Sequence, residues 1–389
     1  MDFALTPEQR EIQALTREFA RHEIEPNAAA WDREHRFPRE LFARIAELGL
    51  MGTCIPEEYG GAGADFVSYI LVLEELSRAD AGVGVTVAVH TSAVTLPLLA
   101  FGSDEQRSRF VPPLARGEHL GAFALTEPEA GSDAGALRTR AEPEGDRWRI
   151  SGGKQWITNA RHAGTFLVFA RTDQEAPGAR GVSAFVLDAD HVRVTRDEEK
   201  LGLNSSVTND IVVEGALVGR DRLLGEENHG FRIAMQTLDG GRIGIAAQAV
   251  GIAQAAYDVA REYAKERHAF GRPIAEFQAI QHKLADMSME IDAARLLVHR
   301  AAWLKDQGEP HTEEGAKAKL FASEMARRQT GEAIQILGGY GFTKEFPVER
   351  YYRDAKITEI YEGTSEIQRL VIARSILGLE PTRVGDRRA

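Results

Sequence analysis

The stretch FALTEPEAGSD at residues 123–133 stands where a helical pattern gives way to a pattern of short strands. It starts like a strand and continues into a loop of small, acidic and hydroxyl-bearing residues. Such a loop can present backbone N–H groups and the hydroxyls of Thr126 and Ser132 to an acceptor-rich ligand, either a phosphate or the edge of a flavin. On composition alone, an ordinary structural turn is the favoured interpretation.

Upstream of this stretch, the sequence predicts helices. Thr6 with Gln9, and Ser103 with Gln106, have the spacing of capping boxes at helix starts. The second of these helices should end near the proline pair at 112–113, because proline breaks helices. Residues 81–103 carry no formal charge, but their glycines, proline and hydroxyl side chains favour a buried core segment over a membrane span.

Downstream, strand-like segments follow one another at the 8–12-residue spacing of a small antiparallel barrel or sandwich. A helical period then returns in three long segments, 231–265, 276–306 and 312–337, which are typical of an antiparallel helix bundle. The expected fold class is therefore α+β multidomain. The three expected domains are an N-terminal α-helical domain at 1–119, a middle antiparallel β-barrel or sandwich domain at 120–228, and a C-terminal four-helix-bundle domain at 229–389.

The overall composition is that of an ordinary soluble globular protein. Its 389 residues include 47 Lys and Arg against 59 Asp and Glu, a formal net charge of −12. That charge argues against nucleic acid and anionic membrane surfaces as partners. One cysteine, Cys54, cannot form an intrachain disulfide or a multi-cysteine metal site, and no metal is expected. No targeting pattern starts the chain, so we expect a cytoplasmic, bacterial protein.

Three further strings each allow two interpretations. KQWITNA at 154–160 places Trp156 and Thr158 on one face of a strand, although a buried core tryptophan is the ordinary alternative. RHAFGRPIAEFQAIQ at 267–281 has two arginines around an aromatic residue, which suits an anion clamp or solvated surface arginines. QILGGYGF at 335–342 ends a helix at two glycines, which permit close approach of a ligand or simply cap the helix.

The string TEIYEGTSEIQR at 358–369 isolates Glu362 just before Gly363. Ser365 and Gln368 have capping-box spacing and predict the start of the last helix. A carboxylate ahead of a helix N-terminus ordinarily complements the helix dipole, which lowers its pKa. A general base needs the reverse, a pKa raised by a dry apolar pocket. The sequence leaves both interpretations open.

Taken together, FALTEPEAGSD, QWITNA, RHAFGRPI, QILGGYGF and IYEGTSEIQR resemble the acyl-CoA dehydrogenase family, in its order and spacing across essentially the whole chain. The resemblance is closest to the short-chain, butyryl-CoA type. It implies an FAD-dependent oxidoreductase of fatty acid β-oxidation, which dehydrogenates an acyl-CoA thioester to the trans-2-enoyl-CoA. Electrons would pass to an electron-transferring flavoprotein, and the usual assembly would be a homotetramer, a dimer of dimers.

The resemblance also implies roles for individual residues. Glu362 would be the catalytic base, and its backbone N–H, together with a flavin ribityl hydroxyl, would polarise the thioester carbonyl. Leu125 and Thr126 would lie near the pyrimidine edge of the flavin, Trp156 beside the isoalloxazine and Thr158 at its N5. The implied substrate-binding residues are Ser132, Asp239, Arg242, Gln248 and Gly363. The implied cofactor-binding residues are Phe123, Leu125, Thr126, Gly131, Ser132, Trp156, Ile157, Thr158, Arg267, Phe270, Gln278, Gln335, Ile336, Gly338, Gly339, Thr364, Ser365 and Glu366.

Several positions narrow this expectation. Arg267, Gln278 and 335–339 would reach the FAD of a neighbouring subunit. Some branched-chain and long-chain members carry the base immediately before the arginine that matches Arg242, where this chain has Gly241. Glutaryl-type members hold an arginine in the stretch that matches VGVTV at 83–87. A glutamine that matches Gln248 shortens the acyl pocket of the short-chain type and favours C4–C6 substrates, with helix packing as the alternative.

Two other classes of protein compete with this interpretation. One is an oxygen-using relative such as an acyl-CoA oxidase, nitroalkane oxidase or flavin monooxygenase, against which Glu362 and the Asp239–Arg242 pair argue. The other is a nucleic-acid-binding or scaffold protein on the same fold, which the net charge of −12 and the lack of a basic run disfavour.

Overall fold

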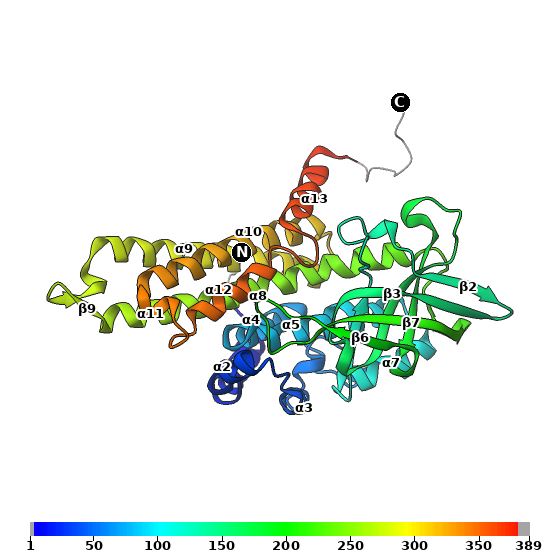
Figure 1. Ribbon diagram of the computed structural model, residues 1–389, viewed down its shortest axis with the longest axis horizontal. Coiled ribbons are helices and arrows are strands. Elements are labelled where there is room, and N and C mark those ends of the chain that lie inside the picture. The colour runs from blue at the N-terminus through cyan, green and yellow to red at the C-terminus, as the bar shows by residue number, and fades with distance from the viewer. Residues whose placement is uncertain (1–3, 380–389) are drawn as a thin grey trace.

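The computed structural model describes residues 4–379 and shows a β-sheet segment between two helical ones (Figure 1). This order confirms the predicted succession of helical, strand and helical segments. The first three residues of the first predicted domain and the last ten of the third lie outside the described residues. The N-terminal helices are α1 (Pro7–Phe19), α2 (Glu25–Glu34), α3 (Arg39–Glu47), α4 (Phe66–Ala79), α5 (Ala81–Ala88), α6 (Leu96–Phe101) and α7 (Asp104–Ala115).

Both predicted capping boxes in this segment are confirmed. The Thr6 hydroxyl accepts from the Gln9 N–H at 3.1 Å, and the Gln9 side chain accepts from the Thr6 N–H at 3.0 Å. Ser103 and Gln106 start α7 in the same way, at 3.2 and 3.0 Å. Each box pairs N–H groups that the first turn of a helix leaves without partners, so local sequence sets where these helices begin.

Helix α7 ends near the proline pair at 112–113, as predicted, but it runs through both prolines to Ala115 instead of stopping at them. Proline removes the N–H that would bond to the carbonyl four residues earlier. Those carbonyls belong to Ser108 and Arg109, which are exposed, so water can bond them instead. The apolar side of the same turns is buried, which holds the helix against the core despite the two lost hydrogen bonds.

The middle segment forms one mixed eight-stranded sheet in the order β6–β7–β3–β2–β4–β5–β8, with β1 pairing β4 beside this path. The predicted antiparallel barrel or sandwich is wrong here. Strand β1 runs parallel to β4, and within the described residues the sheet does not close. A parallel pair depends on a long crossover, which strand spacing cannot show. The strands are β1 (Leu120–Ala124), β2 (Arg140–Glu144), β3 (Arg147–Thr158), β4 (Ala163–Arg171), β5 (Val182–Asp188), β6 (Arg193–Asp197), β7 (Thr208–Gly219) and β8 (Leu223–Leu224).

Long helices carry the C-terminal segment, as the helical period predicts. Helix α8 extends from the sheet to a small hairpin at the far end of the molecule (Figure 1). Helix α10 ends at Gly338, whose φ of 62° confirms the predicted glycine break. These elements are α8 (Gly230–Glu266), β9 (His268–Ala269), β10 (Arg272–Pro273), α9 (Gln278–Asp306), α10 (Thr312–Leu337), α11 (Gly339–Phe342), α12 (Val348–Ile357) and α13 (Ser365–Leu377).

The uncharged stretch is a core element, as predicted. Residues Ala81–Phe101 and helix α8 are long and apolar enough to cross a membrane, yet 78% of each apolar window is buried inside the fold. Within the first, Val89–Thr95 is a π-helical segment. Its His90 accepts from the Gly121 N–H at 3.1 Å and bonds the Leu114 carbonyl at 3.0 Å, while burial lowers the His90 pKa to about 4. The neutral ring therefore joins the helical segment to strand β1.

A buried polar cluster joins all three segments of the chain. The Leu203 N–H, in the loop between β6 and β7, donates to the Asp354 carboxylate of α12 at 2.6 Å. Arg353 of the same helix pairs with Asp32 of α2 at 2.6 Å. Burial and the charge of Asp80 raise the pKa of Asp354 to about 7, although Arg350 opposes the shift. The folded protein therefore holds a proton on Asp354 that the unfolded chain would release at neutral pH.

This cluster predicts a pH effect on stability. Because the pKa of Asp354 is higher in the folded state, its contribution is full at low pH and is lost as the pH rises through about 7. Asp354→Asn keeps an acceptor for the Leu203 N–H but does not ionise. Relative to wild type, the variant should gain melting temperature between pH 5 and pH 8, corresponding to a few kcal/mol at about 1.4 kcal/mol per pKa unit. Calorimetry at both pH values measures it, with exposed Asp146→Asn as control, and a pH-independent difference would contradict it.

Candidate active site

A cavity of about 220 Å³ lies where the sheet, the 81–101 segment, α8 and the turn before α13 meet. All eight cofactor residues that the resemblance implies in the middle segment line it, and so do four of the implied substrate and base residues, one of which, Ser132, belongs to both groups. The lining residues are Val85, Val89, Ala93, Phe123, Leu125, Thr126, Gly131, Ser132, Ala134, Trp156, Ile157, Thr158, Met235, Leu238, Arg242, Tyr361, Glu362, Gly363 and Ile367.

A buried ion pair shapes the 123–133 loop. The Lys154 ammonium donates to the Leu125 carbonyl at 3.0 Å and to the Glu127 carboxylate at 2.8 Å. Glu127 also accepts from the Thr139 N–H and hydroxyl and from the Arg138 N–H. Because the Glu127 carboxylate is turned inward, the loop presents Leu125, Thr126 and Ser132 to the cavity instead. Sequence analysis missed Lys154, although a lysine that alternates with inward-facing strand residues is a signal for a buried charge.

Trp156 stands at an irregularity of strand β3. Its φ is 59°, it lies within the register shift between Lys154 and Ile157, and its side chain is 57% exposed. The alternative of a buried core tryptophan is therefore wrong. Next along the chain, Asn159 has a φ of 70°, and its buried amide donates to the carbonyls of Thr86 and Gly121 at 3.0 and 3.1 Å. A large exposed indole held beside a cavity by a strained backbone is suited to stack on a planar ligand.

The turn that carries Glu362 is held from both sides. Glu362 and Gly363 have φ values of 52° and 94°, a conformation that costs free energy for a glutamate. Gln368 donates to their two carbonyls at 3.2 and 2.8 Å, and Lys319 of α10 donates to the Gly363 carbonyl at 2.7 Å. Lys319 was missed by sequence analysis. Its signal is a lysine at a helix position whose neighbours one turn away, such as Ala322, are small and buried.

The predicted capping box at Ser365 is wrong. Thr364 is the N-cap of α13, and its hydroxyl accepts from the Ile367 N–H at 3.3 Å. Gln368 is thus one position too late to close a box and turns back to the carbonyls of the Glu362 turn. Thr364 and Ser365 are both favourable N-cap residues, so the local sequence does not decide between them. The geometry of the preceding turn makes Thr364 the N-cap.

The Glu362 carboxylate lies directly against the backbone of α8. A Cβ atom at Gly241 would be 2.0 Å from Glu362 Oε2, so no other residue fits there without moving the carboxylate. Oε2 is buried and has no hydrogen-bond partner among the described residues. Position 241 is also where the resemblance puts the alternative base. A carboxylate at either of the two positions that the resemblance implies for a base would therefore reach the same part of the cavity.

Burial dominates the electrostatics of this carboxylate. It raises the pKa of Glu362 to about 7, against the opposing charges of Lys319 and Arg242. A carboxylate that merely complemented the dipole of α13 would have a lowered pKa. The direction found is the one that a base acting near neutral pH requires.

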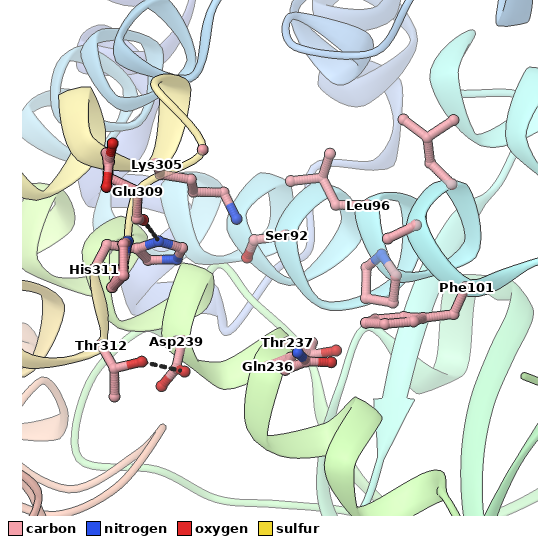
Figure 2. Close-up of a pocket in the computed structure, with 15 residues that line it drawn as sticks. Ser92, Leu96, Phe101, Gln236, Thr237, Asp239, Lys305, Glu309, His311 and Thr312 are labelled. Atoms are coloured by element: carbon pink, nitrogen blue, oxygen red, sulfur yellow. Dashed lines mark hydrogen bonds between the residues drawn. The ribbon is translucent and has the colours of Figure 1, made fainter.

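Arg242 links this cavity to a second one of about 570 Å³ (Figure 2). Its guanidinium donates to Asp239 at 2.6 Å, and Asp239 accepts from the Thr312 hydroxyl at 2.7 Å. Asp239 faces the second cavity, which lies between α8, α6 and the loop joining α9 to α10. Lys305 and His311 line it as well, opposite an apolar side formed by Leu96, Pro97 and Phe101. Residues on two successive turns of α8 thus line two neighbouring cavities.

Gln248 does not line either cavity but controls a residue that does. Its side chain is 1% exposed and donates to the Ala81 carbonyl at 2.8 Å, while the Tyr361 hydroxyl donates to its oxygen. Tyr361 lines the smaller cavity. Both hydrogen-bonding groups of the amide are therefore used, and Gln248 keeps Tyr361 in place.

Comparison with known proteins decides the family. Models of the acyl-CoA dehydrogenase N-terminal, middle and C-terminal domains match residues 6–118, 122–216 and 228–377. The chain belongs to the acyl-CoA dehydrogenase family. It is 51% identical to the mitochondrial short-chain specific acyl-CoA dehydrogenase of Bos taurus, over 95% of this chain and 90% of that protein. It is 48% identical to the short-chain specific enzyme of Clostridium acetobutylicum, over 97% and 100%. The butyryl-CoA dehydrogenase structure from Megasphaera elsdenii superposes with a TM-score of 0.95 at 44% identity, over 97% and 100%.

As an acyl-CoA dehydrogenase, the protein is an FAD-dependent oxidoreductase. The cavity fits this cofactor on its own geometry. Trp156 offers an exposed ring, Thr126 and Thr158 offer hydroxyls, and the space beside Gly131 is open, because beyond its two chain neighbours no described residue has an atom within 4 Å of a Cβ built there. Ser132 lines the same cavity. These groups would hold the isoalloxazine and its adjoining chain.

A second group of implied cofactor residues lies far from the cavity, at the hairpin end of the acyl-CoA dehydrogenase chain (Figure 1). Phe270 at the hairpin tip is 95% exposed, and Arg267 lies over the Tyr340 ring at 5.8 Å. None of this group lines either described cavity, so one chain alone does not unite the two sets. Thr364 and Glu366 lie at the start of α13, beside the cavity. The distant group is Arg267, Phe270, Gln278, Gln335, Ile336, Gly338 and Gly339.

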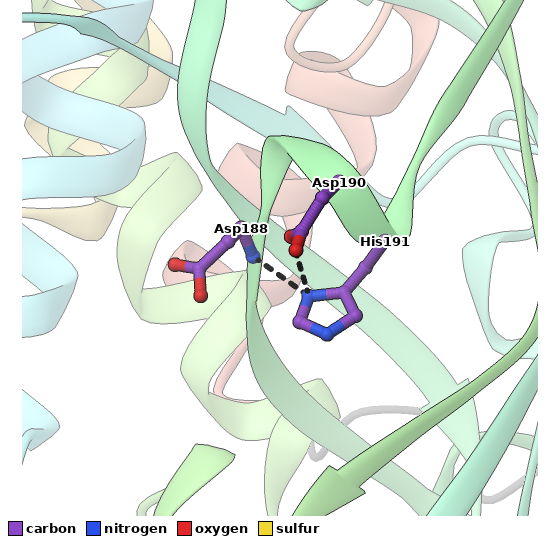
Figure 3. Close-up of side chains that lie close together, drawn as sticks. All are labelled: Asp188, Asp190 and His191. Atoms are coloured by element: carbon purple, nitrogen blue, oxygen red, sulfur yellow. Dashed lines mark hydrogen bonds and ion pairs between the residues drawn. The ribbon is translucent and has the colours of Figure 1, made fainter.

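Among the described residues, one group has the spacing of metal ligands, namely Asp188, Asp190 and His191 (Figure 3). Its charges are already engaged. Asp188 pairs with Arg222 at 2.5 Å, and His191 accepts from the Asp188 N–H at 3.2 Å as part of a cap on a short turn. This arrangement has a structural role, and the cluster lines neither cavity.

The contact between Glu362 and Gly241 predicts the effect of a single methyl group. Gly241→Ala should displace the carboxylate by about 1 Å or more and slow flavin reduction by acyl-CoA by about 10²-fold, because a misplaced catalytic group loses its alignment. Gly240→Ala is the matched control, since its methyl would meet only the mobile end of Lys305. Anaerobic stopped-flow absorbance measures both variants. Equal rates in the two would contradict the assignment of this contact.

Proposed function

We propose that this acyl-CoA dehydrogenase acts on short acyl chains of C4–C6 and passes its electrons to an electron-transferring flavoprotein. The observation that carries the proposal is the buried Glu362 carboxylate, pressed against Gly241 in the same cavity as Thr126, Trp156 and Thr158. A base and a flavin site that share one dry cavity can act on adjacent carbons of one substrate.

Glu362 removes the α-proton of the thioester in this proposal. In water, a carboxylate is far too weak a base for that proton, so the developing enolate needs stabilisation. The Glu362 N–H, which bonds no other described residue, is available to donate to the thioester carbonyl. Exclusion of water by Val85, Leu238 and Ile367 strengthens that hydrogen bond and keeps Glu362 basic. When bound, FAD accepts the β-hydrogen as hydride.

In this proposal, the residues at the end of the cavity limit the length of the substrate's acyl chain. Gln248, held by Ala81 and Tyr361, cannot swing aside without breaking two buried hydrogen bonds. Residues 83–87 include buried valines and no positively charged side chain. A glutaryl substrate is therefore also disfavoured, because this stretch offers no partner for its distal carboxylate. The short-chain names of the relatives from Bos taurus and Clostridium acetobutylicum support the same substrate class.

The CoA moiety would leave the smaller cavity along α8. Asp239 and Arg242 lie one turn apart on the same side of that helix, and each lines one of the two cavities, so a pantetheine chain that passes Arg242 reaches the larger space. Lys305 and His311 there offer positively polarised groups to phosphate. This path agrees with the substrate-binding roles that the resemblance implies for Ser132, Asp239, Arg242 and Gly363, whereas Gln248 would act on the substrate only through Tyr361.

A homotetramer, a dimer of dimers, is part of the proposal. Met289, Leu296 and Trp303 recur every seven residues on α9 and are 64%, 52% and 55% exposed, which leaves an apolar stripe open. The hairpin residues Arg267 and Phe270 would then contact FAD in a neighbouring subunit. The domain limits 1–119, 120–228 and 229–389 stay a proposal, and a cytoplasmic location stays a prediction from the sequence.

An oxygen-using flavoenzyme of the same fold is the alternative function. It would form hydrogen peroxide with butyryl-CoA in air, whereas the proposed enzyme would reduce a dye or an electron-transferring flavoprotein. Measuring both products in one assay separates the two functions.

The base assignment predicts the behaviour of Glu362→Gln. The amide keeps the size of the side chain but cannot accept a proton, so flavin reduction by butyryl-CoA should fall by about 10²–10⁴-fold or more. FAD content and binding of a product analogue should be retained, because Trp156, Thr158 and Arg242 are unchanged. Anaerobic stopped-flow reduction measures the rate. A variant that binds the analogue and reacts within tenfold of wild type would eliminate Glu362.

The chain-length assignment predicts a substrate profile. Flavin bleaching by saturated acyl-CoA substrates should be most rapid at C4–C6 and should decline from C8 onward. Gln248→Ala removes both contacts that hold Tyr361 and Ala81, and should move the optimum to longer chains. Gln254→Ala, on the same helix but outside the cavity, is the matched control. A wild-type optimum at C8 or longer would refute the short-chain proposal.

A further inference from the structure

Lys319 is a buried cation without a carboxylate partner. It has no exposed surface, and no ion pair joins it to another described residue. Its one hydrogen bond goes to the main-chain carbonyl of Gly363 at 2.7 Å. Burying an ammonium group is costly unless its charge serves a nearby negative group. The place of Lys319 on α10, beneath the Glu362 turn, therefore calls for a physical reason.

The Gly363 carbonyl already has a neutral donor. Gln368 reaches it at 2.8 Å and reaches the Glu362 carbonyl at 3.2 Å. Both donors restrain a turn whose two residues have positive φ values of 52° and 94°. The difference between the donors is charge, because Lys319 brings a positive charge and Gln368 does not.

Four ionisable side chains face the Glu362 carboxylate, two of them positively charged and two neutral. Arg242 on α8 also opposes the raised pKa of Glu362, less strongly than Lys319 does, and it is paired with Asp239 at 2.6 Å. Tyr69 on α4 and Tyr361 in the turn itself face the carboxylate as neutral groups. Lys319 on α10 is the remaining cation, and no acidic partner offsets it within ion-pair distance among the described residues.

We propose that Lys319 is a positioning residue for the base, which fixes the Glu362–Gly363 turn against α8 and keeps the Glu362 carboxylate ionised through its buried positive charge. This inference rests on the proposed role of Glu362 and extends it to a residue that touches neither substrate nor cofactor. Burial alone raises the pKa of Glu362, and Lys319 is the largest opposing influence. Without Lys319, more of the enzyme would hold a protonated, inactive Glu362 at neutral pH.

The test compares three variants of the FAD-loaded, full-length protein. Lys319→Met removes anchor and charge, and Gln368→Leu removes an anchor only. Lys317→Met is the matched control, because Lys317 lies on the same helix but pairs with Glu313 at the surface. The pH profile of anaerobic flavin reduction by butyryl-CoA gives the kinetic pKa. Isotope-edited infrared spectra of the carboxyl band, identified by its loss in Glu362→Gln, give the pKa without turnover.

Lys319→Met should raise the pKa of Glu362 by about one unit or more and slow reduction at pH 7 by about fivefold or more. Gln368→Leu should slow reduction while leaving the pKa nearly unchanged, and Lys317→Met should change neither. Lys319→Arg should restore the pKa in part. If Lys319→Met gives no folded holoenzyme, Lys319→Gln, which keeps a donor but loses the charge, takes its place.

An unchanged pKa in the neutral variant overturns the inference, and so does an equal shift in Gln368→Leu. The infrared titration separates this failure from failure of the proposed function. A wild-type protein that no acyl-CoA reduces would refute the function, while the titration would still decide whether Lys319 sets the ionisation of Glu362.

Discussion

The steric constraint on which the site depends is the contact between the Glu362 carboxylate and the backbone of α8 at Gly241. A Cβ at that position would stand 2.0 Å from Oε2, so glycine is required for the carboxylate to enter the cavity. The rest of the site follows from this contact. The turn must bend through positive φ values to aim Glu362 inward, and Gln368 and Lys319 supply the hydrogen bonds that hold that bend.

Two buried lysines hold the two halves of the cavity in the same way. Lys154 donates to the Leu125 carbonyl and shapes the 123–133 loop, and Lys319 donates to the Gly363 carbonyl and shapes the Glu362–Gly363 turn. Burial lowers the pKa of each to about 8, because a surrounding with little water disfavours the charged ammonium form. They differ in their partners, because Glu127 neutralises Lys154 directly whereas Lys319 has only the field of Glu362 and its neighbours. Fixed buried charges of this kind restrict the geometry around a reacting group.

The long helix α8 connects chemistry to architecture. Near its start, Leu238, Asp239 and Arg242 face the two cavities, while Gly241 leaves room for the Glu362 carboxylate. Farther along, Gln248 positions Tyr361, and the helix then runs on to the hairpin at the opposite end (Figure 1). One rigid element thus separates the cavity from the second set of residues that the resemblance implies for the cofactor. That spacing is why a single chain presents seven of the eighteen residues implied for FAD far from the others.

Sequence by itself determined the local features of this protein. Capping boxes at Thr6 and Ser103, the long helical segments, and the strings around Trp156 and Glu362 are written in residues close together, because helix starts and strand faces depend on near neighbours. Only the tertiary structure decided the parallel pairing of β1 with β4, the choice of Thr364 as N-cap, and the raised pKa of Glu362. Each of these depends on groups distant in the chain. A crossover brings β4 beside β1, and α8 and α10 bring Gly241 and Lys319 to a carboxylate more than forty residues away, where exclusion of water sets its charge.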